Sequence, residues 1–269
     1  MSTTVETGHE RIGRAFAQAR GSAALMPYMM GGFPTPEQSL RIGEACIAAG
    51  ADIIELGFPY SDPLADGPVI QAAGTRALEA GTNVAAVLEI AGRLSRSVPV
   101  VAMCYVNMVF APGADAFVER LQRSGASGLI VPDLPHGGSP EVAAACERHG
   151  IALVPLAAPT TPPPRLREIA SSARGFLYVV SVVGTTGERE RLQDSAARLI
   201  GDAKEAASAP VAVGFGISTP EHAAAAAAAG ADGVIVGTRL VRAAAEDPDP
   251  AGAVGGIVSE LAAGLGRAR

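Results

Sequence analysis

Eight short apolar runs recur along the chain, and segments with helical character separate them. Most runs are continuously apolar rather than alternating, which is typical of parallel strands that are buried on both faces. The predicted strands are Ala23–Met30, Asp52–Gly57, Pro99–Val106, Gly128–Pro132, Ile151–Ala157, Phe176–Val182, Pro210–Gly214 and Gly233–Gly237. The predicted helices include Thr35–Ala49, Asn83–Arg96, Pro112–Arg123, Pro140–His149, Glu190–Ala207 and Pro220–Ala229.

Strand and helix alternate about eight times, which is the pattern of a (β/α)8 TIM barrel, an α/β fold. We expect one barrel domain over residues 1–269, with an additional N-terminal helix and flexible ends at about 1–10 and 266–269. A doubly wound sheet is the main alternative, but no G-x-G-x-x-G follows an early strand, and the glycine-rich turns come late. Phe58–Gln71 is too polar and too interrupted by proline to be one helix. It is expected to be a long loop at the carboxyl-end face, where barrel active sites lie.

Charge and cysteine usage narrow the class of protein. The net charge is −6 with no basic run to offset it, so nothing favours nucleic acid or an anionic membrane. Three widely spaced cysteines without a metal-ligand spacing indicate reduced structural thiols. No secretion signal and no apolar run of the ~20 residues that span a bilayer are found, so a cytoplasmic location is expected.

Two carboxylates near the second predicted strand are candidates for acid–base chemistry. Glu55 ends an apolar strand, and burial of a carboxyl raises its pKa toward the range that a general acid needs. A glutamate that faces solvent at the strand end is the alternative. Asp66 lies in the following loop, where Asp beside Pro and Gly commonly caps a turn. It is nevertheless close enough along the chain to face Glu55 across a small ligand.

Glycines at the ends of the last two predicted strands indicate an anion site. Gly214 and Gly216 follow the seventh strand, and Gly237 with Thr238 follows the eighth. Backbone N–H groups and helix starts at these positions are where barrels bind phosphate, although plain turn glycines would give the same pattern. The polar loop 184–189 follows the sixth strand and could order over a ligand as a lid or be an ordinary surface loop.

The chain lacks the residues that other lyase mechanisms need. Lys204 is the only lysine and lies in a charged helical stretch rather than at a strand end, where a Schiff-base lysine would be required. The four histidines are scattered, so no metal site is predicted, and no Ser/His/Asp arrangement stands out. What remains is metal-free acid–base chemistry on a phosphorylated small molecule.

The segment Glu55-Leu56-Gly57-Phe58-Pro59-Tyr60-Ser61-Asp62-Pro63-Leu64-Ala65-Asp66-Gly67-Pro68-Val69-Ile70-Gln71 resembles the signature of the tryptophan synthase α subunit family. Further agreement comes from Gly32-Phe33-Pro34, Pro132-Asp133-Leu134-Pro135 and Gly214-Phe215-Gly216-Ile217, and the resemblance runs from about Arg11 to Ala244. It implies cleavage of indole-3-glycerol phosphate to indole and glyceraldehyde 3-phosphate, with indole passed to a β subunit in an αββα heterotetramer.

The resemblance also implies a role for individual residues. Glu55 matches the general acid–base and Asp66 the carboxylate that accepts the indole N–H. The implied phosphate-binding positions are Gly187, Gly214, Gly216, Gly237 and Thr238, and the implied lid residues are Thr185 and Thr186. The residues implied to line the indole pocket are Ile70, Met103, Tyr105, Tyr178 and Phe215. The implied partner interface includes Pro59, Asp62, Asn107 and Pro135. No cofactor is expected here, since pyridoxal phosphate belongs to the β subunit.

Three other functions stay open at this point. A free-standing indole-3-glycerol-phosphate lyase would use the same residues. A catalytically idle allosteric subunit would keep the fold without the chemistry. Another phosphate-binding barrel, such as a sugar-phosphate epimerase, is disfavoured because the metal ligands that it would need are missing from the sequence.

Overall fold

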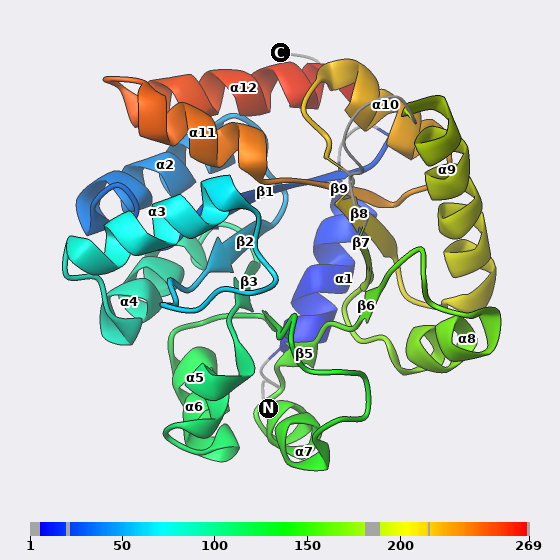
Figure 1. Ribbon diagram of the computed structural model, residues 1–269, viewed down its shortest axis with the longest axis horizontal. Coiled ribbons are helices and arrows are strands. Elements are labelled where there is room, and N and C mark those ends of the chain that lie inside the picture. The colour runs from blue at the N-terminus through cyan, green and yellow to red at the C-terminus, as the bar shows by residue number, and fades with distance from the viewer. Residues whose placement is uncertain (1–5, 20–21, 181–188, 215, 268–269) are drawn as a thin grey trace, which may run out of the picture.

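A computed structural model describes residues 6–19, 22–180, 189–214 and 216–267 of the chain. Strands lie at the centre and helices surround them (Figure 1). The strands are β1 (Ala24–Met30), β2 (Ile54–Gly57), β3 (Val100–Met103), β4 (Gly128–Ile130), β5 (Ala152–Leu153), β6 (Leu156–Ala157), β7 (Leu177–Val180), β8 (Val211–Gly214) and β9 (Gly233–Val236). All strand pairs given for the described residues are parallel.

The sheet runs in the order β5-β4-β3-β2-β1-β9-β8-β7-β6, and its two ends are neighbours in the chain. The predicted strand Ile151–Ala157 is thus two short strands, β5 and β6. Val154 donates its N–H to Leu129 O at 2.9 Å on one side, and Pro155 O accepts from Tyr178 N at 3.0 Å on the other. Because proline has no N–H, the segment changes partner there. The sheet therefore closes into the predicted barrel.

The helices cover the outside of this barrel, apart from α1, which packs against its amino end. They are α1 (Gly8–Gln18), α2 (Pro36–Ala48), α3 (Pro68–Glu79), α4 (Val84–Leu94), α5 (Val106–Phe110), α6 (Ala114–Arg123), α7 (Pro140–Arg148), α8 (Pro163–Ser172), α9 (Arg189–Ala206), α10 (Pro220–Ala228), α11 (Thr238–Glu246) and α12 (Pro250–Gly264). Thr35, Asn83, Ser139 and Thr219 each cap a helix through a side-chain oxygen, as short polar side chains do at this position.

Two predicted boundaries near the second and third strands are wrong. The long loop expected over Phe58–Gln71 ends at Gly67, because Pro68 occupies the first turn of α3 and its fixed φ suits a helix start. The third strand was expected to reach Val106, but it ends at Met103, and Val106 begins α5. Both differences lie at the carboxyl ends of strands, where the chain turns into the loops of the barrel face.

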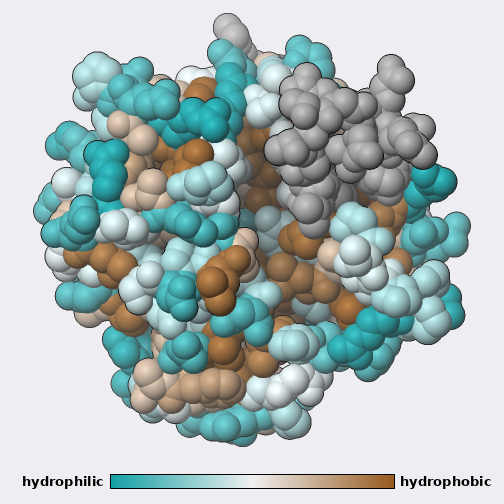
Figure 2. All heavy atoms as spheres, in the orientation of Figure 1, coloured by the Kyte–Doolittle hydropathy of each residue, from teal (hydrophilic) through white to brown (hydrophobic). Residues whose placement is uncertain are grey.

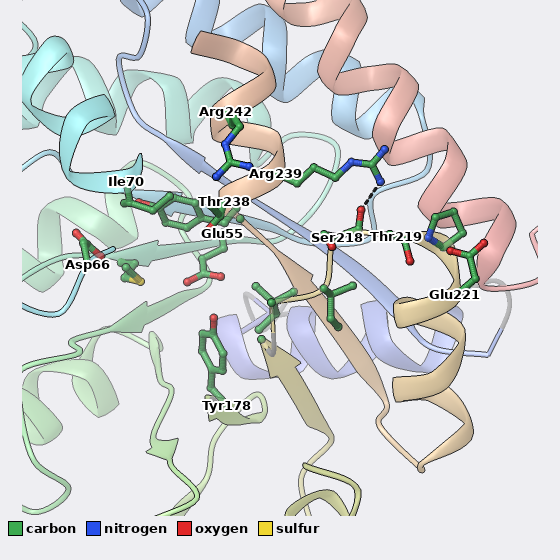
Figure 3. Close-up of a pocket in the computed structure, with 18 residues that line it drawn as sticks. Glu55, Asp66, Ile70, Tyr178, Ser218, Thr219, Glu221, Thr238, Arg239 and Arg242 are labelled. Carbon is green, nitrogen blue, oxygen red and sulfur yellow. Dashed lines mark hydrogen bonds between the residues drawn. The ribbon is translucent and has the colours of Figure 1, made fainter. Parts of the chain in front are cut away.

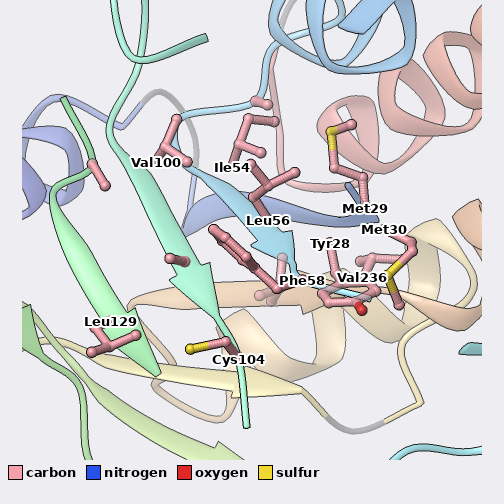
Figure 4. Close-up of a cluster of buried hydrophobic side chains, with 14 of the residues drawn as sticks. Tyr28, Met29, Met30, Ile54, Leu56, Phe58, Val100, Cys104, Leu129 and Val236 are labelled. Carbon is pink, nitrogen blue, oxygen red and sulfur yellow. The ribbon is translucent and has the colours of Figure 1, made fainter. Parts of the chain in front are cut away.

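Two buried clusters hold the fold together. The larger one lies mostly between the sheet and the helices, and some of its residues, among them Leu56, Phe58 and Val100, are drawn in Figure 4. The second lies inside the barrel and includes Met26, Ile53 and other inward-facing strand residues. Ile12 of α1 belongs to this inner cluster and is fully buried. The additional N-terminal helix therefore closes the amino end of the barrel and leaves the carboxyl end open.

Residues near both ends of the chain are fixed by packing and hydrogen bonds. Gly8 N donates to Gly150 O at 2.7 Å, and Thr7 and Glu10 form a capping box at the start of α1. Arg267 donates to Ala23 O at 2.8 Å and to the Asp52 carboxylate at 2.5 Å. The flexible ends expected at about 1–10 and 266–269 stay a prediction, and residues 1–5, 268 and 269 lie outside the described part.

Candidate functional site

A cavity of about 890 Å³ opens at the carboxyl ends of the strands. The face of the molecule drawn in Figure 2 is hollowed near its centre, and hydrophobic side chains gather there. Nine residues proposed from the sequence line the cavity together: Glu55, Asp66, Ile70, Met103, Tyr178, Gly214, Gly216, Gly237 and Thr238. The fold thus brings both carboxylates and the glycines of the last two strands, far apart in sequence, to one site.

Glu55 lies in β2 and faces the cavity from inside the barrel. It follows Ile53 of the inner cluster by two residues, and alternate residues of a strand point to the same face. Its side chain is only 1% exposed, so the solvent-facing alternative is wrong. Burial, with a smaller contribution from the charge of Asp66, raises the pKa of Glu55 to about 8. Figure 3 shows its carboxylate and the Tyr178 hydroxyl pointing toward each other.

Asp66 lies in the loop between β2 and α3 and is partly buried. Burial raises the pKa of its carboxyl, and a hydrogen bond from the Tyr105 hydroxyl offsets part of this shift. The same hydroxyl accepts the Ala65 N–H at 2.9 Å, and the Tyr105 ring stacks on Tyr60 with 5.1 Å between centroids. Tyr105 is not among the residues that line the cavity; it holds the loop that carries Asp66.

The opposite side of the cavity carries the features expected of an anion site. Gly216 has a φ of +51°, which favours glycine, and Gly237 is the N-cap of α11. The helices α10 and α11 both begin beside the cavity, at Pro220 and Thr238, so their N-terminal N–H groups lie there. A Cβ on Gly214 would lie 2.6 Å from the Tyr178 hydroxyl, so glycine is needed at this position.

Six polar residues that line the cavity were not proposed as site residues from the sequence: Tyr28, Ser218, Thr219, Glu221, Arg239 and Arg242. Arg239 donates to the backbone oxygen of Ser218 and pairs with Glu260 at 3.0 Å, so its charge is partly neutralised. Arg242 has no ion pair or hydrogen bond within the described part of the chain. The sequence signal that could have identified Arg242 was its spacing from Thr238. Arg242 follows Thr238 by four residues, so the two lie one helical turn apart on the same face of the helix.

Two of the proposed partner-interface residues, Pro59 and Asp62, lie in the loop between β2 and α3, whereas Asn107 lies in α5 and Pro135 in the loop between β4 and α7. Asp62, Asn107 and Pro135 are exposed, whereas Pro59 is buried. Asn107 donates to the Tyr60 hydroxyl at 2.8 Å, which joins α5 to this loop. Two large apolar side chains are also exposed in this region, Leu64 at 85% and Phe110 at 45%.

Some proposed residues lie outside the part of the chain that the structure describes. They are Thr185 and Thr186 of the expected lid, Gly187 of the expected phosphate site and Phe215 of the expected indole pocket. Within the described residues, no group of three or more His, Cys, Asp and Glu side chains could hold a metal ion. No described helix combines the length and apolar character needed to cross a membrane.

Comparison with known proteins gives a consistent result. A sequence model of the tryptophan synthase alpha chain matches residues 15–257. The tryptophan synthase alpha chain of Gloeobacter violaceus is 46% identical to this chain, and the match covers 90% of this chain and 88% of the relative. The tryptophan synthase alpha chain of Methanosarcina barkeri is 43% identical, and the match covers 96% of this chain and 98% of the relative.

Solved structures agree with the sequence matches. A structure of Mycobacterium tuberculosis tryptophan synthase superposes with a TM-score of 0.87 at 38% identity, covering 95% of this chain and 98% of the other. A structure of the tryptophan synthase a2b2 complex from Pyrococcus furiosus gives a TM-score of 0.84 at 37% identity. The superposition covers 90% of this chain and 98% of the other. The barrel, the shared cavity and these matches lead to one conclusion: the chain belongs to the tryptophan synthase alpha chain family.

Proposed function

We propose that this chain cleaves indole-3-glycerol phosphate by a retro-aldol reaction and releases indole and glyceraldehyde 3-phosphate. The observation that carries the proposal is a single cavity with two carboxylates on one side and two helix starts on the other. A substrate with an aromatic ring at one end and a phosphate at the other fits this arrangement, with the ring beside the carboxylates and the phosphate beside the helix starts. The metal-binding barrels considered as alternatives need ligand clusters of a kind that the described residues do not form.

In this proposal Glu55 moves the protons. Its raised pKa keeps it protonated near neutral pH, so it can donate a proton to C3 of the indole ring. The ring becomes an indolenine cation, and the electron pair of the C3–C1′ bond flows into it as that bond breaks. The C1′ hydroxyl returns its proton to Glu55 and becomes the aldehyde. Asp66 accepts the N1–H and stabilises the positive charge on the ring.

The other cavity residues position the substrate. Gly214, Gly216, Gly237 and Thr238, with Gly187, would hold the phosphate through backbone N–H groups and the Thr238 hydroxyl. Arg242 would add a positive charge at this end of the cavity. Ile70, Met103 and Tyr178, with Phe215, would contact the indole ring, and Thr185 and Thr186 would close over it. Tyr105 would act through Asp66 rather than by touching the ring.

The activity should fall as the pH rises through about 8. The reaction begins with protonated Glu55, and the protonated fraction is lost as pH passes its raised pKa. A pH profile of kcat/KM for indole release checks this, and the Glu55→Gln variant serves as the control because it cannot show this limb. An activity that stays constant up to pH 10 would contradict the assignment of Glu55 as the acid.

We further propose that the chain works in the cytoplasm as part of an αββα complex, with pyridoxal phosphate bound only by β. The a2b2 assembly of the Pyrococcus furiosus relative supports this. So do the exposed apolar side chains of Leu64, in the same loop as Asp62, and of Phe110, in the same helix as Asn107, since large exposed apolar groups are typical of protein interfaces. This surface adjoins the loop that holds Asp66, so binding of β can affect catalysis.

Indole release should increase when the β subunit is added to the purified chain. The Leu64→Asp variant should lose at least about 10-fold in affinity for β, because a charge would be buried in place of an apolar side chain. Titration of indole release with β measures both effects. Leu78→Asp is the control, since Leu78 is also exposed but lies at the end of α3, away from this surface.

The same titration separates the alternatives. A rate that does not respond to β would support a free-standing lyase. An idle allosteric subunit would show no indole release with or without β, and the use of indole-3-glycerol phosphate by the complex would then be unaffected by Glu55→Gln.

A further inference from the structure

Tyr28 lies beside Glu55 on the neighbouring strand of the barrel. The two residues are directly paired in the parallel register of β1 and β2. Tyr28 follows Met26 of the inner cluster by two residues, so it points into the barrel as Glu55 does. Both line the cavity, and Tyr28 is 5% exposed. Figure 4 shows Tyr28 among the buried side chains near Val236.

These two neighbours carry unpaired polar atoms. The Tyr28 hydroxyl and Glu55 Oε2 are two of four fully buried side-chain polar atoms that have no hydrogen-bond partner within the described residues. Such groups are uncommon in folded proteins because burial without a partner costs stability. They occur where a ligand or another protonation state supplies the missing bond.

Gly57 leaves room for the Tyr28 hydroxyl at this position. A Cβ on Gly57 would lie 2.2 Å from the hydroxyl oxygen, so any larger residue would push the phenol away. Burial also raises the pKa of the Tyr28 phenol well above its ordinary value. The phenol therefore keeps its proton throughout the working pH range and remains a hydrogen-bond donor.

We propose that Tyr28 is a positioning residue that donates a hydrogen bond to the Glu55 carboxylate whenever that group is ionised, and so sets its proton affinity. The catalytic consequence rests on the proposed function: Glu55 becomes an anion after it protonates the substrate, and a buried anion needs a donor. When Glu55 holds its proton this bond is not needed, which fits the observation that the Tyr28 hydroxyl and Glu55 Oε2 are both unpaired.

Other titratable and charged groups lie near Glu55, and one of them, the Tyr178 hydroxyl, also points toward its carboxylate. The titratable and charged groups that line the cavity besides Tyr28 and Glu55 are Asp66, Tyr178, Glu221, Arg239 and Arg242. Tyr105 does not line the cavity and acts through its hydrogen bond to Asp66. Asp66 accepts rather than donates and opposes ionisation of Glu55. Tyr178 approaches Glu55 from β7, so replacement of Tyr28 leaves it in place. Any change in the Tyr28 variant is then the contribution of the Tyr28 hydroxyl.

The test is the Tyr28→Phe variant, with the Glu55 pKa measured by ¹³C NMR of the side-chain carboxyl in free protein and assigned with Glu55→Gln. Loss of a donor to the anion should raise the Glu55 pKa by about one pH unit. The alkaline limb of the kcat/KM pH profile should move to higher pH by the same amount, and kcat should fall about 10-fold. Ser127→Ala is the control, because it removes another buried, unpaired hydroxyl outside the cavity.

Both variants should unfold at a temperature no lower than wild type, since each removes an unsatisfied buried hydroxyl. Only Tyr28→Phe should move the Glu55 pKa. An unchanged Glu55 pKa in folded Tyr28→Phe would overturn the proposal, whatever the enzymatic activity. If wild type released no indole while the pKa moved as expected, the proposed function would fail but the Tyr28–Glu55 interaction would stand.

Discussion

Glu55→Gln is expected to reduce indole release by about 10²- to 10⁴-fold, the range that a general acid–base group contributes. Gln keeps the shape of the side chain but cannot donate a proton to C3 or receive one from the C1′ hydroxyl. Asp66→Asn should lose less, about 10- to 100-fold, because it removes one charge-assisted hydrogen bond and leaves proton transfer intact. Steady-state rates of indole formation, with substrate in excess, measure both variants.

The stability of the Glu55→Gln protein provides a control for misfolding. Burial raises the pKa of Glu55 from 4.5 to about 8, so between these values the folded protein holds a proton that the unfolded chain has lost. Wild-type stability should therefore fall as the pH rises across this window. Neutral Gln removes this dependence, and the variant should be at least as stable as wild type at pH 8. Full activity in a folded Glu55→Gln protein would overturn the proposed mechanism.

Arg267→Ala is expected to destabilise the protein by about 3–5 kcal/mol, as the loss of one partner of a buried ion pair does. The Arg267 and Asp52 side chains are only 9% and 16% exposed. Asp52 also accepts the Leu25 N–H at 2.7 Å, and Arg267 donates to Ala23 O and Gly50 O. The change would leave the Asp52 charge and two backbone oxygens without this partner. Thermal unfolding should show a midpoint lower by roughly 10 °C.

Arg123→Ala is the matched control for this variant. Arg123 pairs with Glu119 at 2.7 Å, but the two side chains are 71% and 41% exposed. Exposed pairs contribute about 0–1 kcal/mol because solvent screens them. If Arg267→Ala lost no more stability than Arg123→Ala, the buried pair would not be an anchor of the C-terminal segment. Neither change touches the cavity, so indole release at low temperature should be retained in both.

The strands and most helices were predictable because their signals are local. Apolar runs marked all eight barrel strands, and the helix predicted to begin at Pro220 does begin there. The division of Ile151–Ala157 into β5 and β6 was not predictable, because it depends on which neighbour each backbone group bonds once the barrel closes. The start of α3 at Pro68 was missed because a proline also suits a loop, and packing of the helix decides between the two.

The site was predictable where residue chemistry contrasts with its surroundings. A glutamate in an apolar strand and glycines at strand ends stand out, and the structure gathers them in one cavity. Tyr28 did not stand out, because a tyrosine in an apolar run is usually a core residue. Arg239 and Arg242 were missed because an arginine on an amphipathic helix is ordinarily a surface residue. Only the closing of the barrel shows which face of β1 and α11 meets the cavity.

The position of α1 has a consequence for the order in which the chain can fold. Synthesis produces this helix before any of the barrel strands, yet Phe16 packs on Phe176 with 5.8 Å between ring centroids and approaches Gly233 of β9, the last described strand. A newly made α1 must therefore wait until nearly the whole polypeptide has left the ribosome before it can dock. A fluorescent probe on the exposed side of α1 would then report the final step of assembly rather than an early one.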